Sequence, residues 1–223
     1  MLICMYKHYK KLKRQVSGGR KMVVNLPGIG MISTSKETNF QCKRCKRCCE
    51  KRNGQIVLSP MDVTVISEFL DISREEFIKL KTIRVNYMFV PQIALKTYGK
   101  KEQCCFLDRT GCTIHEVSPF QCYTFPIIPI DEEKKLYVQQ QVKSYCGEEG
   151  PTISIEEWLE KNKRYRDEKE QRKFWNEATD VLDKHCKRLP KERLEKIFHI
   201  LYENENHTLE QLRANVEECY KIC

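Results

Sequence analysis

The sequence predicts an α+β fold that is predominantly helical, with a metal-stapled, cysteine-rich core, a few short strands and a C-terminal helical segment. Three observations lead to this class. The chain has 13 cysteines among 223 residues, and most of them are crowded into its middle. Short β-branched runs alternate there with turn-forming residues. From Pro151 onward, apolar residues recur at spacings of three and four, which is typical of amphipathic helices.

Charge and turn-forming residues divide the chain into three predicted parts. The net charge is +9, and residues 1–36 carry eight Lys or Arg without one acidic residue. We expect residues 1–38 to form a basic, mobile N-terminal tail with one short strand near Met22 to Asn25. Residues 39–150 are predicted to be a cysteine-cluster, metal-binding domain, and residues 151–223 a C-terminal helical region.

Within the predicted cysteine domain, two strands and two helices can be placed. The apolar run Gln55–Leu58 reads as a strand, and Ser59 followed by Pro60 is a helix start. That helix should end at Phe69 or Leu70. A second helix is expected from Ser73 to about Ile83, and the segment Pro91 to Thr97 is a second strand.

The C-terminal region contains several helix-start signals and three further cysteines. Helices are predicted to open at Ser154, Pro190 and Thr208. Cys186, Cys219 and Cys223 fall on apolar faces of this pattern, so we interpret them as small core residues rather than metal ligands.

Four cysteines lie within the first dense block, Phe40 to Glu50. Cys42, Cys45 and Cys48 repeat at intervals of three, as in the ferredoxin run C-x2-C-x2-C, so a coiled loop could aim all three sulfurs at one centre. Cys49 follows directly. In an extended chain its side chain would point to the opposite side, toward a second site or a second segment.

A second group of cysteines supplies the partners that this block needs. Setting Cys104 aside, eight thiols are available for two tetrahedral sets: Cys42, Cys45, Cys48, Cys49, Cys105, Cys112, Cys122 and Cys146. One cubane with one mononuclear site, or two mononuclear sites, would use them all. A turn at Asp108 to Gly111 would aim Cys105 and Cys112 at one point. A disulfide framework is the alternative, but nothing in the sequence indicates secretion.

Basic residues are interleaved with the cysteines of the first block. They can compensate the negative charge of thiolates around a metal, or form a nucleic-acid surface. No apolar run is long enough to cross a bilayer, and the N-terminal residues lack the order of a signal peptide, so we expect a cytoplasmic protein with no membrane partner. A reducing cytoplasm would keep the thiols available to metal.

The ordered motifs of residues 40–147 resemble the YkgJ-type cysteine-cluster family, described as a zinc- or iron-chelating domain. The motifs are the Cys42–Cys49 run, Ile56–Asp62, Ser73–Phe77, Cys105–His115 and Ser118–Pro126. The chain has Ser118 and Tyr123 where the family commonly has arginine, so the roles of those arginines do not carry over. The resemblance implies metal binding without a settled reaction.

We therefore expect a metal-binding protein that holds an iron–sulfur cluster or zinc, with [4Fe-4S] favoured by the three-cysteine loop. Electron transfer to a redox or protein partner would follow from such a cluster. Two alternatives remain open: a metal-dependent modifying enzyme, as in a protein-methylating branch of the wider family, and a zinc protein that binds nucleic acid. His115 is interpreted as a residue beside the site rather than a ligand.

Overall fold

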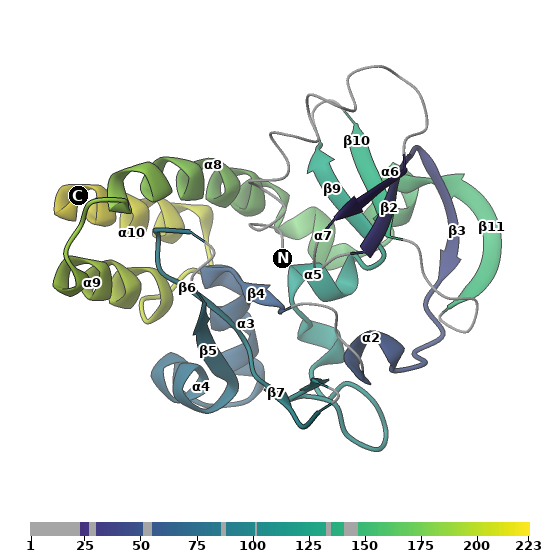
Figure 1. Ribbon diagram of the computed structural model, residues 1–223, viewed down its shortest axis with the longest axis horizontal. Helices are drawn as coiled ribbons and strands as arrows, with labels where there is room; N and C mark the ends of the chain where they lie inside the picture. The colour runs from purple at the N-terminus through teal and green to yellow at the C-terminus, as the bar shows by residue number, and fades with distance from the viewer. Residues whose placement is uncertain are drawn as a thin grey trace. The chain divides into compact units, whose positions relative to one another are not determined.

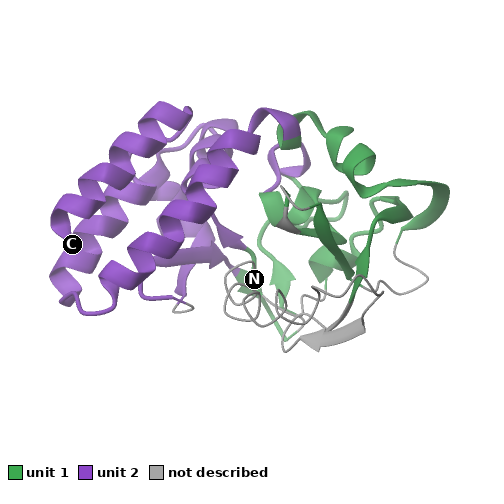
Figure 2. Cartoon of the chain, turned by 90° about the horizontal axis from the view of Figure 1, so that it is seen from above, with its two compact units in different colours: residues 1–56, 97–113, 120–165 green, residues 57–96, 114–119, 166–223 purple. Residues whose placement is uncertain are grey.

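The computed structural model describes residues 23–26, 30–50, 55–85, 88–100, 102–132, 135–140 and 147–223 (Figure 1). The contacts of the chain group into two compact units, shown in different colours in Figure 2. Unit 1 comprises Met1–Ile56, Thr97–Thr113 and Phe120–Tyr165, and unit 2 comprises Val57–Lys96, Ile114–Pro119 and Arg166–Cys223. The three-part division made from the sequence stays a prediction.

Unit 1 contains three small antiparallel sheets. The largest has the order β1-β2-β10-β9, built from Val23–Leu26, Gly30–Ser35, Leu136–Gln140 and Ile127–Asp131. β3 (Glu37–Gln41) pairs with β11 (Glu148–Ser154), and β7 (Thr97–Tyr98) pairs with β8 (Gln103–Cys104). Four short helices lie in the described part of the unit: α2 (Arg47–Glu50), α5 (Phe120–Tyr123), α6 (Ile155–Glu160) and α7 (Lys163–Asp167), which continues past the unit boundary at Tyr165.

A core of large apolar side chains holds these small elements of unit 1 together. Its buried members are Phe120, Ile127, Tyr137, Ile155, Leu159 and Tyr165. They come from α5, the largest sheet, α6 and α7, so each element depends on the others for burial. The predicted helix start at Ser154 is found, because the Ser154 hydroxyl accepts a hydrogen bond from the Glu157 amide at 3.1 Å.

Unit 2 combines one small sheet with helices. The sheet has the order β4-β6-β5, from Val57–Leu58, Gln92–Leu95 and Thr82–Val85. The helices are α3 (Pro60–Phe69), α4 (Arg74–Lys81), η1 (His115–Val117), α8 (Lys169–Cys186), α9 (Lys191–Tyr202) and α10 (Leu209–Ile222). The caps predicted at Ser59 and Thr208 are both present as capping boxes.

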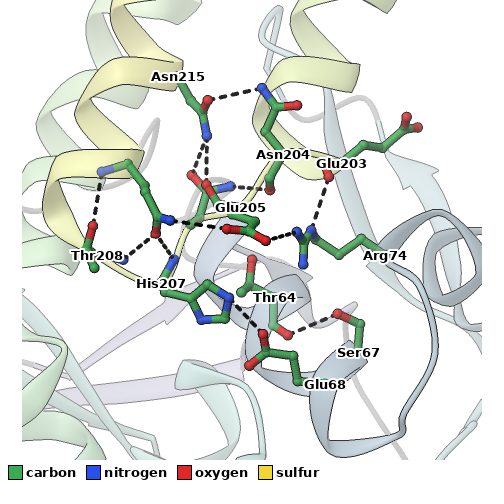
Figure 3. A network of polar contacts seen from close by, with 12 residues as sticks. Thr64, Ser67, Glu68, Arg74, Glu203, Asn204, Glu205, His207, Thr208 and Asn215 are labelled. Atoms are coloured by element: carbon green, nitrogen blue, oxygen red, sulfur yellow. Dashed lines mark hydrogen bonds and ion pairs between the residues drawn. The ribbon is translucent and has the colours of Figure 1, made fainter.

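The connection between α9 and α10 binds to α3 and α4 through polar contacts (Figure 3). His207 Nε2 lies 2.7 Å from Glu68 Oε1, and the Arg74 guanidinium donates to the Glu203 carbonyl at 3.1 Å. Asn215 Nδ2 reaches back from α10 to the Glu205 carbonyl at 2.9 Å. These bonds fix the helices around an apolar interior that includes the fully buried Phe77, Leu182, Leu201 and Leu212.

The predicted fold class is wrong in describing the protein as predominantly helical with a few strands. Eleven strands in four antiparallel sheets occur in the described part of the chain, so the fold is mixed α+β. One reason is visible at Thr82. The predicted helix to Ile83 ends at Lys81, since the Thr82 hydroxyl caps the Ile78 carbonyl and the β-branched residues that follow pair with β6. The segments that form β2, β9, β10 and β11 were not predicted as strands.

Candidate metal centre

The first cysteine block changes direction repeatedly because two of its residues adopt left-handed backbone conformations. Arg44 has φ 52° and Lys46 has φ 67°. These residues stand between successive cysteines of the Cys42–Cys45–Cys48 run. Single left-handed residues reverse the local curl of a chain, so the loop can wrap instead of continuing the extended course of β3.

The sulfurs of Cys48 and Cys49 lie close together, 3.8 Å apart. Both residues belong to α2, whose first turn is closed by hydrogen bonds from the Cys49 and Glu50 amides to the Lys46 carbonyl. The expectation that Cys49 points away from Cys48 assumed an extended chain. In a helix, consecutive side chains are instead separated by about 100°, so both thiols can serve the same side of the loop.

An aromatic anchor fixes the strand that leads into this loop. Phe40 is buried, and its carbonyl accepts a hydrogen bond from Trp158 Nε1 at 2.9 Å. Its ring meets the Phe125 ring edge-on, with 6.1 Å between centroids. Cys42 therefore follows directly from a rigidly held strand.

The partner strand β11 approaches β3 so closely that only glycine fits at position 147. Gly147 has φ +82°, and a Cβ atom there would lie 2.3 Å from Phe40 Cε2. Glu148 pairs with Gln41 in the same ladder. The residue that follows Cys146 in the chain is thus packed beside the strand that precedes Cys42. Cys146 itself lies outside the described residues.

The second cysteine block contains a hairpin-like turn between Cys105 and Cys112, as predicted. Asp108 Oδ1 accepts hydrogen bonds from the amides of Thr110 and Gly111 at 2.7 and 2.8 Å. The Thr110 hydroxyl also donates to it. These bonds lower the pKa of the Asp108 carboxyl, and the bond from the Thr110 hydroxyl has the largest effect. Leu107 bridges to Cys112 across the turn.

The two blocks meet within unit 1. Helix α2, which carries Cys48 and Cys49, packs against β8, which ends at Cys104. The Lys46 ammonium donates a hydrogen bond to the Arg109 carbonyl at the tip of the turn. Segments about 60 residues apart in sequence are therefore joined by backbone packing and by a charged side chain.

Cys122 lies on the short helix α5, beside an aromatic cluster. Phe120 stacks on Tyr165 at 6.4 Å and meets Tyr123 edge-on at 5.5 Å. The Thr124 hydroxyl donates to the Phe120 carbonyl at 2.9 Å, which closes the turn around Cys122. This packing fixes the backbone from which the Cys122 thiol projects.

The predicted ligands differ in exposure. Cys42 is exposed, Cys49 is buried, and five others are partly buried: Cys45, Cys48, Cys105, Cys112 and Cys122. Among the residues that the structure describes, no three Cys, His, Asp or Glu side chains are arranged to hold a metal ion. The assignment of the eight thiols as ligands stays a prediction.

One cysteine that the prediction set aside is structurally central. Cys104 is only 5% exposed and lies on β8 against α2. The signals available in the sequence were its position next to Cys105 and the predicted strand from Pro91 to Thr97, which leads the chain toward it. His115 lies on η1 in unit 2, where its side chain is exposed.

Positive charge surrounds the first block in the structure as in the sequence. Lys43, Arg44 and Arg47 are exposed, and Arg47 forms an ion pair with Glu50 at 2.9 Å. Such cations can offset the charge that four thiolates place around a metal. Thiolate sulfur is a ligand that both zinc and iron accept.

Closely spaced cysteines on turns and short elements, with cations between them, are typical of a metal-chelating cysteine domain. Residues 41–147 match the family model CxxCxxCC, described as "Putative zinc- or iron-chelating domain", which confirms the resemblance predicted from the sequence motifs. No solved structure matches the chain. Within the described residues, every helix falls short of the length or apolar character that crossing a membrane requires.

Proposed function

We propose that this protein is an electron-transfer protein whose metal is an iron–sulfur cluster of the [4Fe-4S] type. The ligands would come from the eight thiols Cys42, Cys45, Cys48, Cys49, Cys105, Cys112, Cys122 and Cys146. The observation that carries the proposal is the meeting of the two cysteine blocks, through α2 against β8 and through Lys46 on Arg109. A four-ligand site built from both blocks needs that proximity.

The conformation of the first loop supports a cluster rather than an isolated ion. Left-handed residues between its cysteines bend the loop, and such a bent loop would let three sulfurs of a C-x2-C-x2-C run turn toward a cluster when it binds. A zinc site more often takes two ligands from each of two turns. A bound cluster would supply reversible one-electron chemistry, whereas zinc has no redox role.

The residues around the loop would tune such a centre. The Phe40 ring packs against Phe125 and Trp158, which holds the strand that leads to the first ligand. Lys46 and Arg47 place positive charge within the loop, which favours a more negative, reduced centre. We place the protein in a reducing cytoplasm, with a redox protein as its partner.

The test is purification of the full chain without oxygen, followed by absorption spectroscopy and analysis of iron, sulfide and zinc. The proposal expects a brown protein with broad visible absorption that bleaches when dithionite is added. A colourless protein with stoichiometric zinc would overturn the cluster and electron transfer but leave metal chelation standing. Folded protein without metal would overturn both.

A further inference from the structure

Three cysteines that have no part in the proposed metal centre gather at one end of the helices of unit 2. Cys186 is the last residue of α8, Cys219 lies in the last turns of α10, and Cys223 follows α10. α8 and α10 pack together, and the His185 and Tyr220 rings meet at 6.0 Å between centroids. This contact aligns the end of α8 with the end of α10.

The three thiols lie close enough to influence one another's pKa, and Cys186 and Cys223 each affect the pKa of the other. Cys219 Sγ is turned toward the backbone of α9, where it contacts the Ile197 carbonyl at 3.9 Å. The arrangement therefore selects Cys186 and Cys223 as a pair and leaves Cys219 as a packed neighbour.

The two members of the pair differ in their surroundings. Cys186 is 1% exposed, and burial raises the pKa of its thiol to about 12. Burial also raises the pKa of Cys223, but the neighbouring Cys186 thiol and the positive charge of Arg193 act in the opposite direction. Cys223 is only partly buried, and the Arg193 guanidinium is held nearby by its bond to the Ile222 carbonyl at 3.2 Å. Cys223 is thus the accessible nucleophile and Cys186 its buried neighbour.

We propose that Cys186 and Cys223 form a reversible disulfide by exchange with a low-molecular-weight disulfide such as glutathione disulfide. The Cys223 thiolate attacks one sulfur of glutathione disulfide, whose S–S bond breaks and releases one glutathione thiolate. The deprotonated Cys186 then attacks Cys223 Sγ and displaces the second glutathione. The protein loses two protons and two electrons, and glutathione disulfide is reduced to two thiols.

The new bond would join the end of α8 to the end of α10 and close a loop that contains α9. The two sulfurs must come within about 2 Å of each other to bond. Cys223 can supply that movement because it follows the helix and is partly exposed. The closed loop restricts the unfolded chain, so the oxidised protein should resist urea better than the reduced protein.

The experiment uses the full metallated chain in a series of glutathione redox buffers. Remaining thiols are blocked with iodoacetamide, the chain is digested without reductant, and linked peptides are identified by mass spectrometry. We expect a peptide joining Cys186 to Cys223 in the wild-type chain, and its loss in Cys223→Ser. The matched control, Cys219→Ala, should keep the link.

Unfolding in urea provides a second measurement that does not depend on peptide recovery. Oxidation should raise the urea midpoint of the wild-type chain and of Cys219→Ala, but not that of Cys223→Ser. The proposal would be overturned by a link from Cys223 to Cys219 or to any cysteine of residues 42–122. It would also be overturned if glutathione stayed on Cys223 and no internal link formed. These outcomes do not bear on the metal content, so the two proposals fail separately.

Discussion

The described cysteines of unit 1 lie in turns and on very short elements, whereas Cys186 and Cys219 of unit 2 lie inside a helical core. In unit 1 the backbone between cysteines adopts left-handed conformations, and cations surround the thiols. In unit 2 the thiols pack in the core as small apolar side chains do, and burial raises the pKa of both Cys186 and Cys219 to about 12. The backbone around a cysteine therefore indicates its role better than the number of cysteines does.

The largest expected effect comes from replacing cysteines in unit 1, compared with replacing a cysteine in unit 2. Cys45→Ser or Cys122→Ser should remove or destabilise the metal, because a protonated hydroxyl is a poor ligand and the binding energy of a closed site contributes to folding. Cys219→Ala should cost roughly 1 kcal/mol and keep the metal, since it leaves only a small cavity. Metal per chain and urea unfolding measure both. If Cys219→Ala emptied the site while Cys122→Ser left it full, the contrast between the units would be wrong.

The second-largest expected effect concerns Gly147, which follows Cys146 and packs closely against β3. Gly147→Ala combines an unfavourable φ with an overlap on the Phe40 ring, so the free energy of unfolding should fall by about 3 kcal/mol. Gly99→Ala is the matched control: its φ is +70° and no heavy atom lies within 4 Å of the added Cβ. It should cost only about 1 kcal/mol. Equal losses in the two variants would mean that the contact with Phe40 has no role.

Local signals were readable in the sequence because they depend on few neighbouring residues. The caps at Ser59, Ser154 and Thr208 and the turn at Asp108 each need only a side chain within a few residues of an amide. The helical burial of Cys219 followed from spacing alone. These features need no knowledge of distant segments.

Long-range pairing could not be read in the same way. β3 pairs with β11, which lies more than 100 residues further along the chain, and the Phe40 carbonyl accepts a hydrogen bond from the equally distant Trp158. No local sequence pattern specifies such partners. The helical conformation of Cys48 and Cys49 was missed because four residues are too few to show a period. Cys104 was not assigned as a ligand because two sets of four thiols leave one cysteine unused. Its burial results from the packing of β8 against α2, which the sequence does not indicate.

A smaller effect should appear with pH in unit 2. Burial raises the pKa of Asp180 to about 6, so the folded chain binds a proton more tightly than the unfolded chain does. Stability should therefore fall as pH rises from about 4 to 6, by about 1 kcal/mol once solvent screening is allowed for. Asp180→Asn should flatten urea midpoints across this range. A fall of the same size in Asp180→Asn would assign the pH dependence to other groups.

The smallest expected effect concerns Lys46, the side chain that links the two cysteine blocks. Lys46→Met keeps the length of the side chain but removes the donor to the Arg109 carbonyl, so the turn that carries Cys105 and Cys112 loses one charged hydrogen bond. A loss of about 1 kcal/mol corresponds to roughly fivefold weaker retention of metal against a chelator. Lys43→Met is the control, since it removes an exposed positive charge from the same loop. If both variants released metal equally fast, the effect of Lys46 would come from its charge alone and not from the joining of the two blocks.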